Sequence, residues 1–296
     1  MWMRHEPPDC SDGEVDVVSI SGATKVAAVV GWPIEHSLSP AIHNAGFEST
    51  GVDWTYVALG VRPEHGDEIV EMSAGLGVAG LSVTMPYKTT VAAQVHEVDE
   101  TSRRLESVNT VSFAEDRRSR GHTTDGDGLL GALASEGVEV SGRSVLVLGT
   151  GGAGRSVIEA FSRRSPRRLM VSNRSSDRSE PFGIASKMER VDWAERTAAV
   201  AAADIVVNCT SVGMGTDRST PFDTTCVGSQ HTIVDLVYHP LETRLLEEAR
   251  RRGARPIGGL GMLVHQAALQ QEIWTGHLPD VELMSRVARS ALAARG

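Results

Sequence analysis

The chain has 296 residues, of which 41% are hydrophobic and 23% are charged, and its formal net charge is −9 at pH 7. This length allows two domains with separate cores, and the composition is typical of a globular protein rather than a membrane-embedded or disordered one. The negative charge, together with the lack of any basic run interleaved with aromatic residues, argues against a nucleic-acid-binding protein.

The cysteines and histidines indicate neither a disulfide framework nor a metal site. Cys10, Cys209 and Cys226 are odd in number and form no C-x-x-C pair, which fits a reducing, cytoplasmic location. The histidines show no H-E-x-x-H spacing, so we expect no metal. Residues 1–24 carry five acidic residues between positions 6 and 16 and contain no long apolar run. We therefore expect neither a signal peptide nor a membrane span there, and interpret the segment as a disordered extension.

The first ordered element is expected at Lys25–Gly31, a short apolar run that predicts a β-strand. It leads to Ser37 and Ser39, which stand just before Pro40. Serine can cap a helix and proline is tolerated at its first position, so we expect a helix from Pro40 to Thr50 that Gly51 ends. Two serines beside a helix N-terminus also suit a carboxylate. Because capping alone would explain Ser39, the stretch by itself does not decide between the two.

Strands and helices then alternate. A strand at 53–59, a helix at 63–74 and a strand at 78–84 form the βαβ order of a mainly parallel sheet. The last of these strands stops at Met85 and Pro86 and presents Lys88 where α/β sheets bind ligands, at the carboxyl ends of strands. Lys88 is therefore a candidate for proton transfer.

A strand pair at 107–112 and 118–122 precedes Asp125, which begins a helix with an apolar face at Leu129 and Leu133. Asp125 is a second candidate for the chemistry. Taken alone, it is more simply explained as a carboxylate that interacts with a helix dipole.

The stretch 145–148 is a strand expected to be covered on both faces, and Gly149, Gly151 and Gly154 follow it in G-x-G-x-x-G spacing before an amphipathic helix. The first glycine permits a tight turn, the second lets the backbone approach a pyrophosphate, and the third allows close helix packing. With a strand before and a helix after, the motif favours a dinucleotide site over an ordinary turn.

The following strand, 168–172, indicates which dinucleotide. An NAD enzyme usually has an acidic residue there for the ribose 2′-hydroxyl, whereas this strand is followed by Asn173 and Arg174. Arg174 and Arg178 would suit a 2′-phosphate, so the sequence favours NADP. The alternative is that both arginines are solvated surface residues.

The rest of the chain continues the alternation, with strands at 203–208 and 231–237, a helix at 241–252, a short segment at 254–256 and helices through 274 and over 280–294. No linker separates the halves, so we expect crossings near Asp125 and Gly261. The predicted class is α/β with two α/β domains: a substrate-binding and catalytic domain at 25–124, with 262–296 packing back on it, and a Rossmann-like NADP domain at 125–261.

Motifs along nearly the whole chain resemble those of the shikimate dehydrogenase family, which includes shikimate/quinate dehydrogenases. They run in order through 31–40 (GWPIEHSLSP), 43–44 (HN), 83–88 (VTMPYK), 108–110 (VNT), 124–126 (TDG), 149–153 (GTGGA), 173–174 (NR), 208–214 (NCTSVGM), 235–238 (DLVY) and 259–263 (GLGML) with Gln266.

The resemblance implies an NADP-dependent oxidoreductase that reduces 3-dehydroshikimate to shikimate, in chorismate and aromatic amino-acid biosynthesis. It implies a small-molecule substrate and leaves a monomer and a homodimer both open. Lys88 and Asp125 resemble the family's catalytic pair, and Ser37 and Ser39 resemble the residues that hold the substrate carboxylate. The other substrate contacts would be Thr84, Asn109, Tyr238 and Gln266. The cofactor would be held by Gly149, Gly151, Gly152, Ala153, Gly154, Asn173, Arg174, Arg178, Thr210, Gly259 and Met262.

Two positions depart from the family's pattern. The family usually has asparagine two residues before Thr84 and again two residues before Asp125, where this chain has Ser82 and Thr123. Some branches carry serine at the first position, so activity is expected to survive. A hydroxyl has a shorter reach than an amide and only one donor, so these two positions bear on the substrate preference.

Three alternatives remain. A quinate/shikimate dehydrogenase that prefers NAD is the main rival, and a tetrahydrofolate-linked dehydrogenase shares the plan of two domains with a lysine and NADP but lacks these serines. A catalytically silent nucleotide-sensing homologue is the third, and the presence of both Lys88 and Asp125 argues against it.

Overall fold

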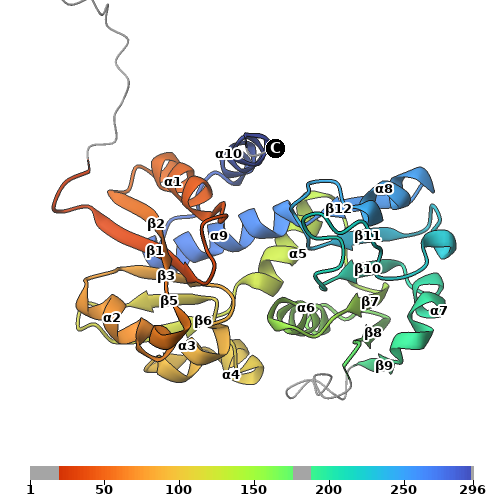
Figure 1. Ribbon diagram of the computed structural model, residues 1–296, viewed down its shortest axis with the longest axis horizontal. Coiled ribbons are helices and arrows are strands. Elements are labelled where there is room, and N and C mark those ends of the chain that lie inside the picture. Colours follow the sequence, from red (N-terminus) through yellow and green to blue (C-terminus); the bar gives the residue numbers. More distant parts are fainter. Residues whose placement is uncertain (1–19, 176–187, 295–296) are drawn as a thin grey trace, which may run out of the picture.

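Two six-stranded sheets, one in each half of the molecule, carry the fold (Figure 1). The computed structural model describes residues 20–175 and 188–294. The strands of the first sheet lie between Lys25 and His122 in the order β2-β1-β3-β5-β6-β4, and those of the second lie between Ser144 and Gly258 in the order β12-β11-β10-β7-β8-β9. We call these halves the first and second lobes.

The first lobe is built on a mainly parallel sheet. Strand β1 (Lys25–Gly31) pairs in parallel with β2 (Trp54–Gly60) and β3 (Gly80–Val83). Strand β5 (Thr110–Phe113) is antiparallel to both β3 and β6 (Ser119–His122), with which it forms a hairpin. The two-residue strand β4 (Glu97–Val98), too short to give a sequence pattern, extends the edge in parallel with β6.

The helices of the first lobe include the two that the sequence predicts, over 40–50 and 63–74. They are α1 (Ser39–Thr50), a 3-10 turn over Pro63–Glu68 that continues into α2 (Ile69–Gly75), α3 (Lys88–Gln94) and α4 (Glu100–Leu105). The helix expected over 63–74 is thus a 3-10 helix followed by an α-helix. The helices α3 and α4, of seven and six residues, are additions that the sequence did not predict.

Ser39 does not cap α1, and that prediction is wrong. The helix begins at Ser39 itself, and Leu38, whose side chain has no capping group, holds the N-cap position. The Ser37 hydroxyl accepts a hydrogen bond from the Ser39 N–H at 3.2 Å, so the preceding serine satisfies that backbone donor. The predicted end of the helix is correct, because Gly51 takes a left-handed conformation with φ 65°.

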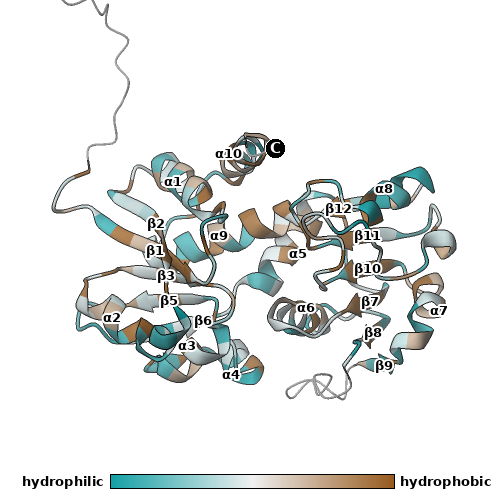
Figure 2. Cartoon of the chain, in the orientation of Figure 1, coloured by the Kyte–Doolittle hydropathy of each residue, from teal (hydrophilic) through white to brown (hydrophobic). Residues whose placement is uncertain are grey.

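The second lobe is an all-parallel sheet with helices on both sides, as the buried strand run predicts. Its strands are β7 (Ser144–Leu148), β8 (Arg168–Ser172), β9 (Glu189–Val191), β10 (Ile205–Asn208), β11 (Thr232–Asp235) and β12 (Arg255–Gly258). Every residue of β7 is buried. Figure 2 shows strong hydrophobic colour at β7 and β10 and hydrophilic colour over α8 at the periphery.

Helices α5 (Asp125–Ser135) and α6 (Gly152–Ser162) accompany this sheet together with α7 (Arg196–Ala201) and α8 (Arg244–Arg251). Helix α8 starts three residues later than predicted because Thr243 caps it, accepting from the Leu246 N–H. Two short 3-10 turns, over Trp193–Glu195 and Thr224–Cys226, complete the described part of the lobe.

Helix α9 (Leu260–Thr275) returns the chain from the second lobe to the first (Figure 1). Helix α10 (Val281–Ala293) then packs on α1 through a shared apolar cluster that includes Ile42 and Met284. Helices α5 and α9 cross closely, since a Cβ on Gly128 would stand 2.8 Å from the Gln266 nitrogen. In the described ranges, no helix is both long enough and apolar enough to cross a membrane.

Candidate active site

A cavity of about 550 Å³ lies between the two lobes. All the residues that the sequence suggested for catalysis and substrate binding line it: Ser37, Ser39, Thr84, Lys88, Asn109, Asp125, Tyr238 and Gln266. They come from the loop after β1 and the start of α1, the end of β3, the residue before β5, the starts of α3 and α5, the loop after β11 and the face of α9. The second lobe contributes Ala153, Met214, Leu236 and Gly259 to the opposite wall.

Lys88 and Asp125 form an ion pair at the cavity wall. The Lys88 Nζ donates to Asp125 Oδ2 at 2.5 Å, and their side chains are 19% and 10% exposed. Each stands at the first position of a helix, α3 for Lys88 and α5 for Asp125. The two helix starts come together because the strands that precede them, β3 and β6, end at the same side of the first sheet. The sequence could identify both residues but not their distance.

Asn109 holds the second oxygen of the carboxylate. Its Nδ2 donates to Asp125 Oδ1 at 2.8 Å and to Thr124 Oγ1 at 3.0 Å. Its Oδ1 accepts from the Thr124 N–H at 2.9 Å and from Thr110 Oγ1 at 2.8 Å. Both carboxylate oxygens thus have donors, so the Asp125 side chain has a fixed orientation from which it directs the Lys88 ammonium into the cavity.

The serine pair lies at another part of the same wall. Ser39 is buried, and its hydroxyl forms a hydrogen bond with Tyr56. Burial raises the pKa of the Tyr56 hydroxyl above its usual range, against the opposing effect of hydrogen bonds with Ser82 and Ser39. Tyr56 is therefore a neutral donor at physiological pH. The pair offers hydroxyl groups beside the start of α1, where an anionic group is favoured by the helix dipole.

The glycine loop after β7 stands next to the ion pair. Gly149 has φ 95°, and a Cβ on Gly154 would lie 2.1 Å from the Gly149 oxygen, so both positions require glycine. A Cβ on Gly152 would lie 3.6 Å from Lys88 Cδ, whereas one on Gly151 would meet open space. No side chain caps α6 at Gly151, which leaves this helix N-terminus suited to a phosphate.

The segment after β8 contains Asn173, Arg174 and Ser175 in its described part, and no carboxylate among them. The Asn173 side chain donates to the Ser175 oxygen at 2.7 Å, and Arg174 is exposed. The other predicted clamp residue, Arg178, lies outside the described residues. These described features are compatible with a 2′-phosphate.

The remaining predicted cofactor residues lie along the second lobe. Thr210 is held by Asn208, whose Oδ1 accepts from the Thr210 hydroxyl at 2.6 Å. Gly259 must be glycine, because a Cβ would stand 2.2 Å from the Leu236 oxygen. Ala153, Gly259 and Met262 line the cavity, whereas the other described members of the set do not.

The two departures from the family's pattern have different surroundings. Ser82 lines the cavity. Thr123 does not, because its hydroxyl points to the other side, donating to the Ser107 oxygen at 2.6 Å and accepting from Ser102 at 2.9 Å. Only the serine can therefore contact a ligand of this cavity directly.

Other cavity residues were not predicted. Gln270 lies one turn after Gln266 on α9, and this spacing of four residues was the available signal. Met85 and Met214 are exposed apolar residues on opposite walls, 73% and 53% exposed. Trp32 follows β1 directly. A methionine or tryptophan at a strand end carries no specific sequence signal, so these residues required the tertiary structure.

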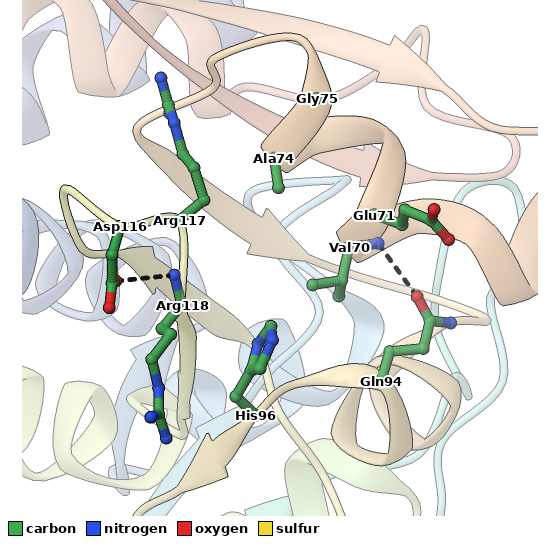
Figure 3. A pocket seen from close by; sticks show the side chains of 9 residues that line it. All are labelled: Val70, Glu71, Ala74, Gly75, Gln94, His96, Asp116, Arg117 and Arg118. Carbon is green, nitrogen blue, oxygen red and sulfur yellow. Dashed lines mark hydrogen bonds between the residues drawn. The ribbon is translucent and has the colours of Figure 1, made fainter.

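A second depression lies on the first lobe, between α2, the end of α3 and the β5–β6 hairpin (Figure 3). Its polar groups include Gln94, which accepts from the Val70 N–H at 3.0 Å, and Asp116, which accepts from the Arg118 N–H at 3.1 Å. None of the predicted site residues lines it. Across residues 20–175 and 188–294, no cluster of His, Cys, Asp and Glu is suited to a metal ion.

Comparisons with known proteins agree with this geometry. Three family models match the chain: the shikimate dehydrogenase substrate binding domain at residues 29–111, the shikimate / quinate 5-dehydrogenase at 132–221 and the shikimate 5′-dehydrogenase C-terminal domain at 259–289. A shikimate dehydrogenase (NADP(+)) from Pyrococcus abyssi is 42% identical over 271 residues, which is 90% of this chain and 98% of that protein.

Two solved structures are similar over most of their length. A shikimate dehydrogenase in complex with NADP+ has a TM-score of 0.86 and 31% identity, covering 93% of this chain and 98% of that one. The enzyme from Thermus thermophilus in complex with NADP(H) and shikimate has a TM-score of 0.83 and 34% identity, covering 90% and 100%. With this identity over nearly its whole length and the Lys88–Asp125 cavity between two lobes, the chain belongs to the shikimate dehydrogenase family.

Proposed function

We propose that this protein is an NADP-dependent shikimate dehydrogenase, which catalyses the reversible reduction of 3-dehydroshikimate to shikimate in aromatic amino-acid biosynthesis. The observation that carries the proposal is the convergence of Ser37, Ser39, Thr84, Asn109, Tyr238 and Gln266 with the Lys88–Asp125 pair in one cavity. These residues offer hydroxyl and amide groups for a polyhydroxylated acid, and an ammonium for the ketone that is reduced.

Lys88 acts on the substrate carbonyl. As the ketone is reduced, negative charge develops on its oxygen, and the Lys88 ammonium donates a hydrogen bond or a proton there. Asp125 holds the ammonium from behind at 2.5 Å, and Asn109 prevents the carboxylate from turning away. The partly buried position of the pair strengthens its electrostatic effect relative to one in bulk water.

The remaining residues orient the substrate. Ser37 and Ser39 bind its carboxylate by hydrogen bonds that are stronger than those to a neutral acceptor. Thr84 at the end of β3, Tyr238 from the loop after β11 and Gln266 from α9 contact the ring hydroxyl groups. A fixed orientation places the carbonyl oxygen at the Lys88 ammonium.

The dinucleotide supplies the hydride when it is bound. The residues that would hold it fit this role, because Gly151 leaves open space over the uncapped N-terminus of α6 and the described residues 173–175 contain no carboxylate. Arg174 and Arg178 would hold the 2′-phosphate. The closeness of Gly152 to Lys88 would bring the nicotinamide end of the cofactor beside the substrate.

A steady-state assay of shikimate oxidation tests the proposal. We expect turnover with NADP to exceed turnover with NAD, and shikimate to be used more efficiently than quinate. Faster turnover of quinate with NAD would identify a quinate/shikimate dehydrogenase instead. Binding of NADP without turnover of either substrate would identify a nucleotide-sensing homologue.

The cellular setting and assembly are part of the proposal. The free thiols of Cys209 and Cys226 support a reducing, cytoplasmic location, and the protein would act there as a monomer or homodimer. Light scattering on the purified protein distinguishes the two assemblies. The proposed substrate domain is 25–124 with 262–296, and the proposed NADP domain is 125–261.

A further inference from the structure

A continuous chain of hydrogen bonds runs along the wall of the cavity, which Ser82, Gln270 and Asn109 line. Tyr56 donates to Ser82 Oγ at 2.6 Å, and Ser82 donates to Gln270 Oε1 at 2.6 Å. Gln270 Nε2 donates to Thr110 Oγ1 at 2.9 Å, and Thr110 donates to Asn109 Oδ1 at 2.8 Å. Asn109 then donates to Asp125, which also accepts from Lys88.

All the donors in this chain point the same way, toward the Asp125 carboxylate. Hydrogen bonds in such an arrangement polarise one another, so each donor strengthens the next. The residues from Tyr56 to Asn109 are buried, and no bulk water replaces a lost link there. The strength and direction of the bonds that reach Asp125 therefore depend on every member before it.

Gln270 is the link that the rest of the chain cannot replace. Ser82 and Thr110 are directly opposite each other in the antiparallel pair of β3 and β5, and Gln270 bridges them from α9 with the two ends of one amide. Its Nε2 also donates to the Asn109 backbone oxygen at 3.2 Å. It thus reaches Asn109, which orients Asp125, in two ways: directly at the backbone oxygen and, through Thr110, at the side-chain oxygen.

We propose that Gln270 is a positioning residue for the Lys88–Asp125 pair, acting through Thr110 and Asn109 on the orientation of the carboxylate. The proposal rests on the function given above and deepens it. It also gives a role to Ser82, because the short serine hydroxyl at that position leaves room for the Gln270 amide and donates to it at 2.6 Å.

The test compares Gln270→Met with Gln271→Met in the shikimate oxidation assay. Gln271 is the adjacent residue on α9, is equally buried at 1% exposure, and bonds to His43 rather than to the chain. We expect Gln270→Met to lower kcat by roughly ten- to a hundredfold, with KM for shikimate changed less than about threefold. Gln271→Met should lose comparable thermal stability and keep kcat within about threefold of the wild type.

Two further variants keep the proposal testable if Gln270→Met fails to fold. Tyr56→Phe and Ser82→Ala remove earlier donors with little change in volume, and each should lower kcat by roughly two- to tenfold. Adding Ser82→Ala to Gln270→Met should cause no further loss, because both break one chain. Three results would each overturn the role of Gln270. They are equal losses of kcat in Gln270→Met and Gln271→Met, losses that multiply in the double variant, and an unchanged kcat in both Tyr56→Phe and Ser82→Ala. Absence of turnover in the wild type would instead overturn the proposed function.

Discussion

At the scale of single residues, the chemistry depends on Lys88 and on the carboxylate that holds it. Lys88→Met keeps most of the side-chain stem and removes the charge, so we expect kcat to fall by roughly a hundred- to ten-thousandfold with a much smaller change in KM. Asp125→Asn should also be severe, and the double variant should be scarcely worse than the worse single one, because the pair acts as a unit. Near-native kcat in Lys88→Met, measured at saturating substrate, would contradict this role.

Ser37 is expected to act in binding rather than in the chemistry. Its hydroxyl oxygen accepts from the Ser39 N–H, an arrangement that directs the hydroxyl toward the cavity at the start of α1. Ser37→Ala should raise KM for shikimate by roughly ten- to a hundredfold, the effect of losing a hydrogen bond to a charged group. The opposite pattern, a native KM with a collapsed kcat, would assign the serine to proton transfer.

Arg174 tests the preference for the cofactor. It follows the end of β8 at Ser172 and is exposed, with no carboxylate in the adjacent described positions. Arg174→Ala should raise KM for NADP by on the order of tenfold and leave the kinetics with NAD nearly unchanged. Equal losses with both cofactors would point to a folding defect, and a wild type that prefers NAD would exclude the clamp.

At the scale of elements, α1, β2 and α9 meet at a buried histidine. The His43 ring is fully buried, stacks on Tyr56 with ring centroids 4.0 Å apart, and contacts Gln271 of α9. Burial lowers the pKa of His43 from 6.5 to about 3, although a hydrogen bond with the Gln270 side chain acts in the opposite direction. The folded protein therefore keeps this ring neutral in a pH range where the unfolded chain protonates it.

This difference predicts acid sensitivity of the first lobe. The unfolded state binds the additional proton as pH falls below 6.5, so the stabilisation is complete above that value and is lost progressively toward pH 3. Between pH 7 and 5 the loss should be on the order of 2 kcal/mol. Urea denaturation at the two pH values, compared with His43→Gln, measures it. The free energy of unfolding should depend less on pH in His43→Gln than in the wild type. An identical pH dependence would contradict the assignment of this effect to His43.

A second contact between elements places the ion pair relative to the cofactor helix. Gly126, next to Asp125 in α5, donates its N–H to Ser156 of α6 at 2.8 Å. A Cβ on Gly126 would lie 2.2 Å from the Ser156 oxygen, so no other residue fits there without a shift of one helix. Because α6 begins at the glycine loop, this contact sets the distance between the substrate chemistry and the proposed phosphate site.

At the scale of the whole molecule, an ion pair joins the lobes beside the chain crossing at Asp125. Arg104 of α4 donates to Glu159 of α6 at 2.8 Å, and the Glu159 side chain is only 2% exposed. Arg163 contacts the other oxygen of Glu159 at 3.0 Å. A buried carboxylate that loses one of its partners is costly, although the partial exposure of the arginines reduces the effect.

Arg104→Met should therefore destabilise the protein by about 1–2 kcal/mol, as measured by urea denaturation. Arg103→Met is the matched control, because Arg103 lies on the same helix and donates to the Val98 oxygen within the first lobe. The control should change stability by less than about 0.5 kcal/mol. Equal effects of the two substitutions would show that the contact between lobes contributes nothing.

The sequence alone determined much of the architecture, since local patterns carry it. Strands β1 and β8 occupy the predicted residues. Helix α1 ends before Gly51 and helix α5 begins at Asp125, both as predicted. Glycine spacing and apolar periodicity depend on neighbours along the chain, which is why they can be read without a structure. Short elements such as β4 and α4 have too few residues for such a pattern.

Only the tertiary structure decided how the site is held. The bond from Lys88 to Asp125 joins residues 37 positions apart, and the bond from Ser82 to Gln270 joins residues 188 positions apart. The bond from the Ser39 N–H to Ser37, the turn of Thr123 away from the cavity and the place of Gln270 follow from which side chains meet after the sheets and α9 have packed. Such contacts depend on distance in space, and no local property of the chain encodes them.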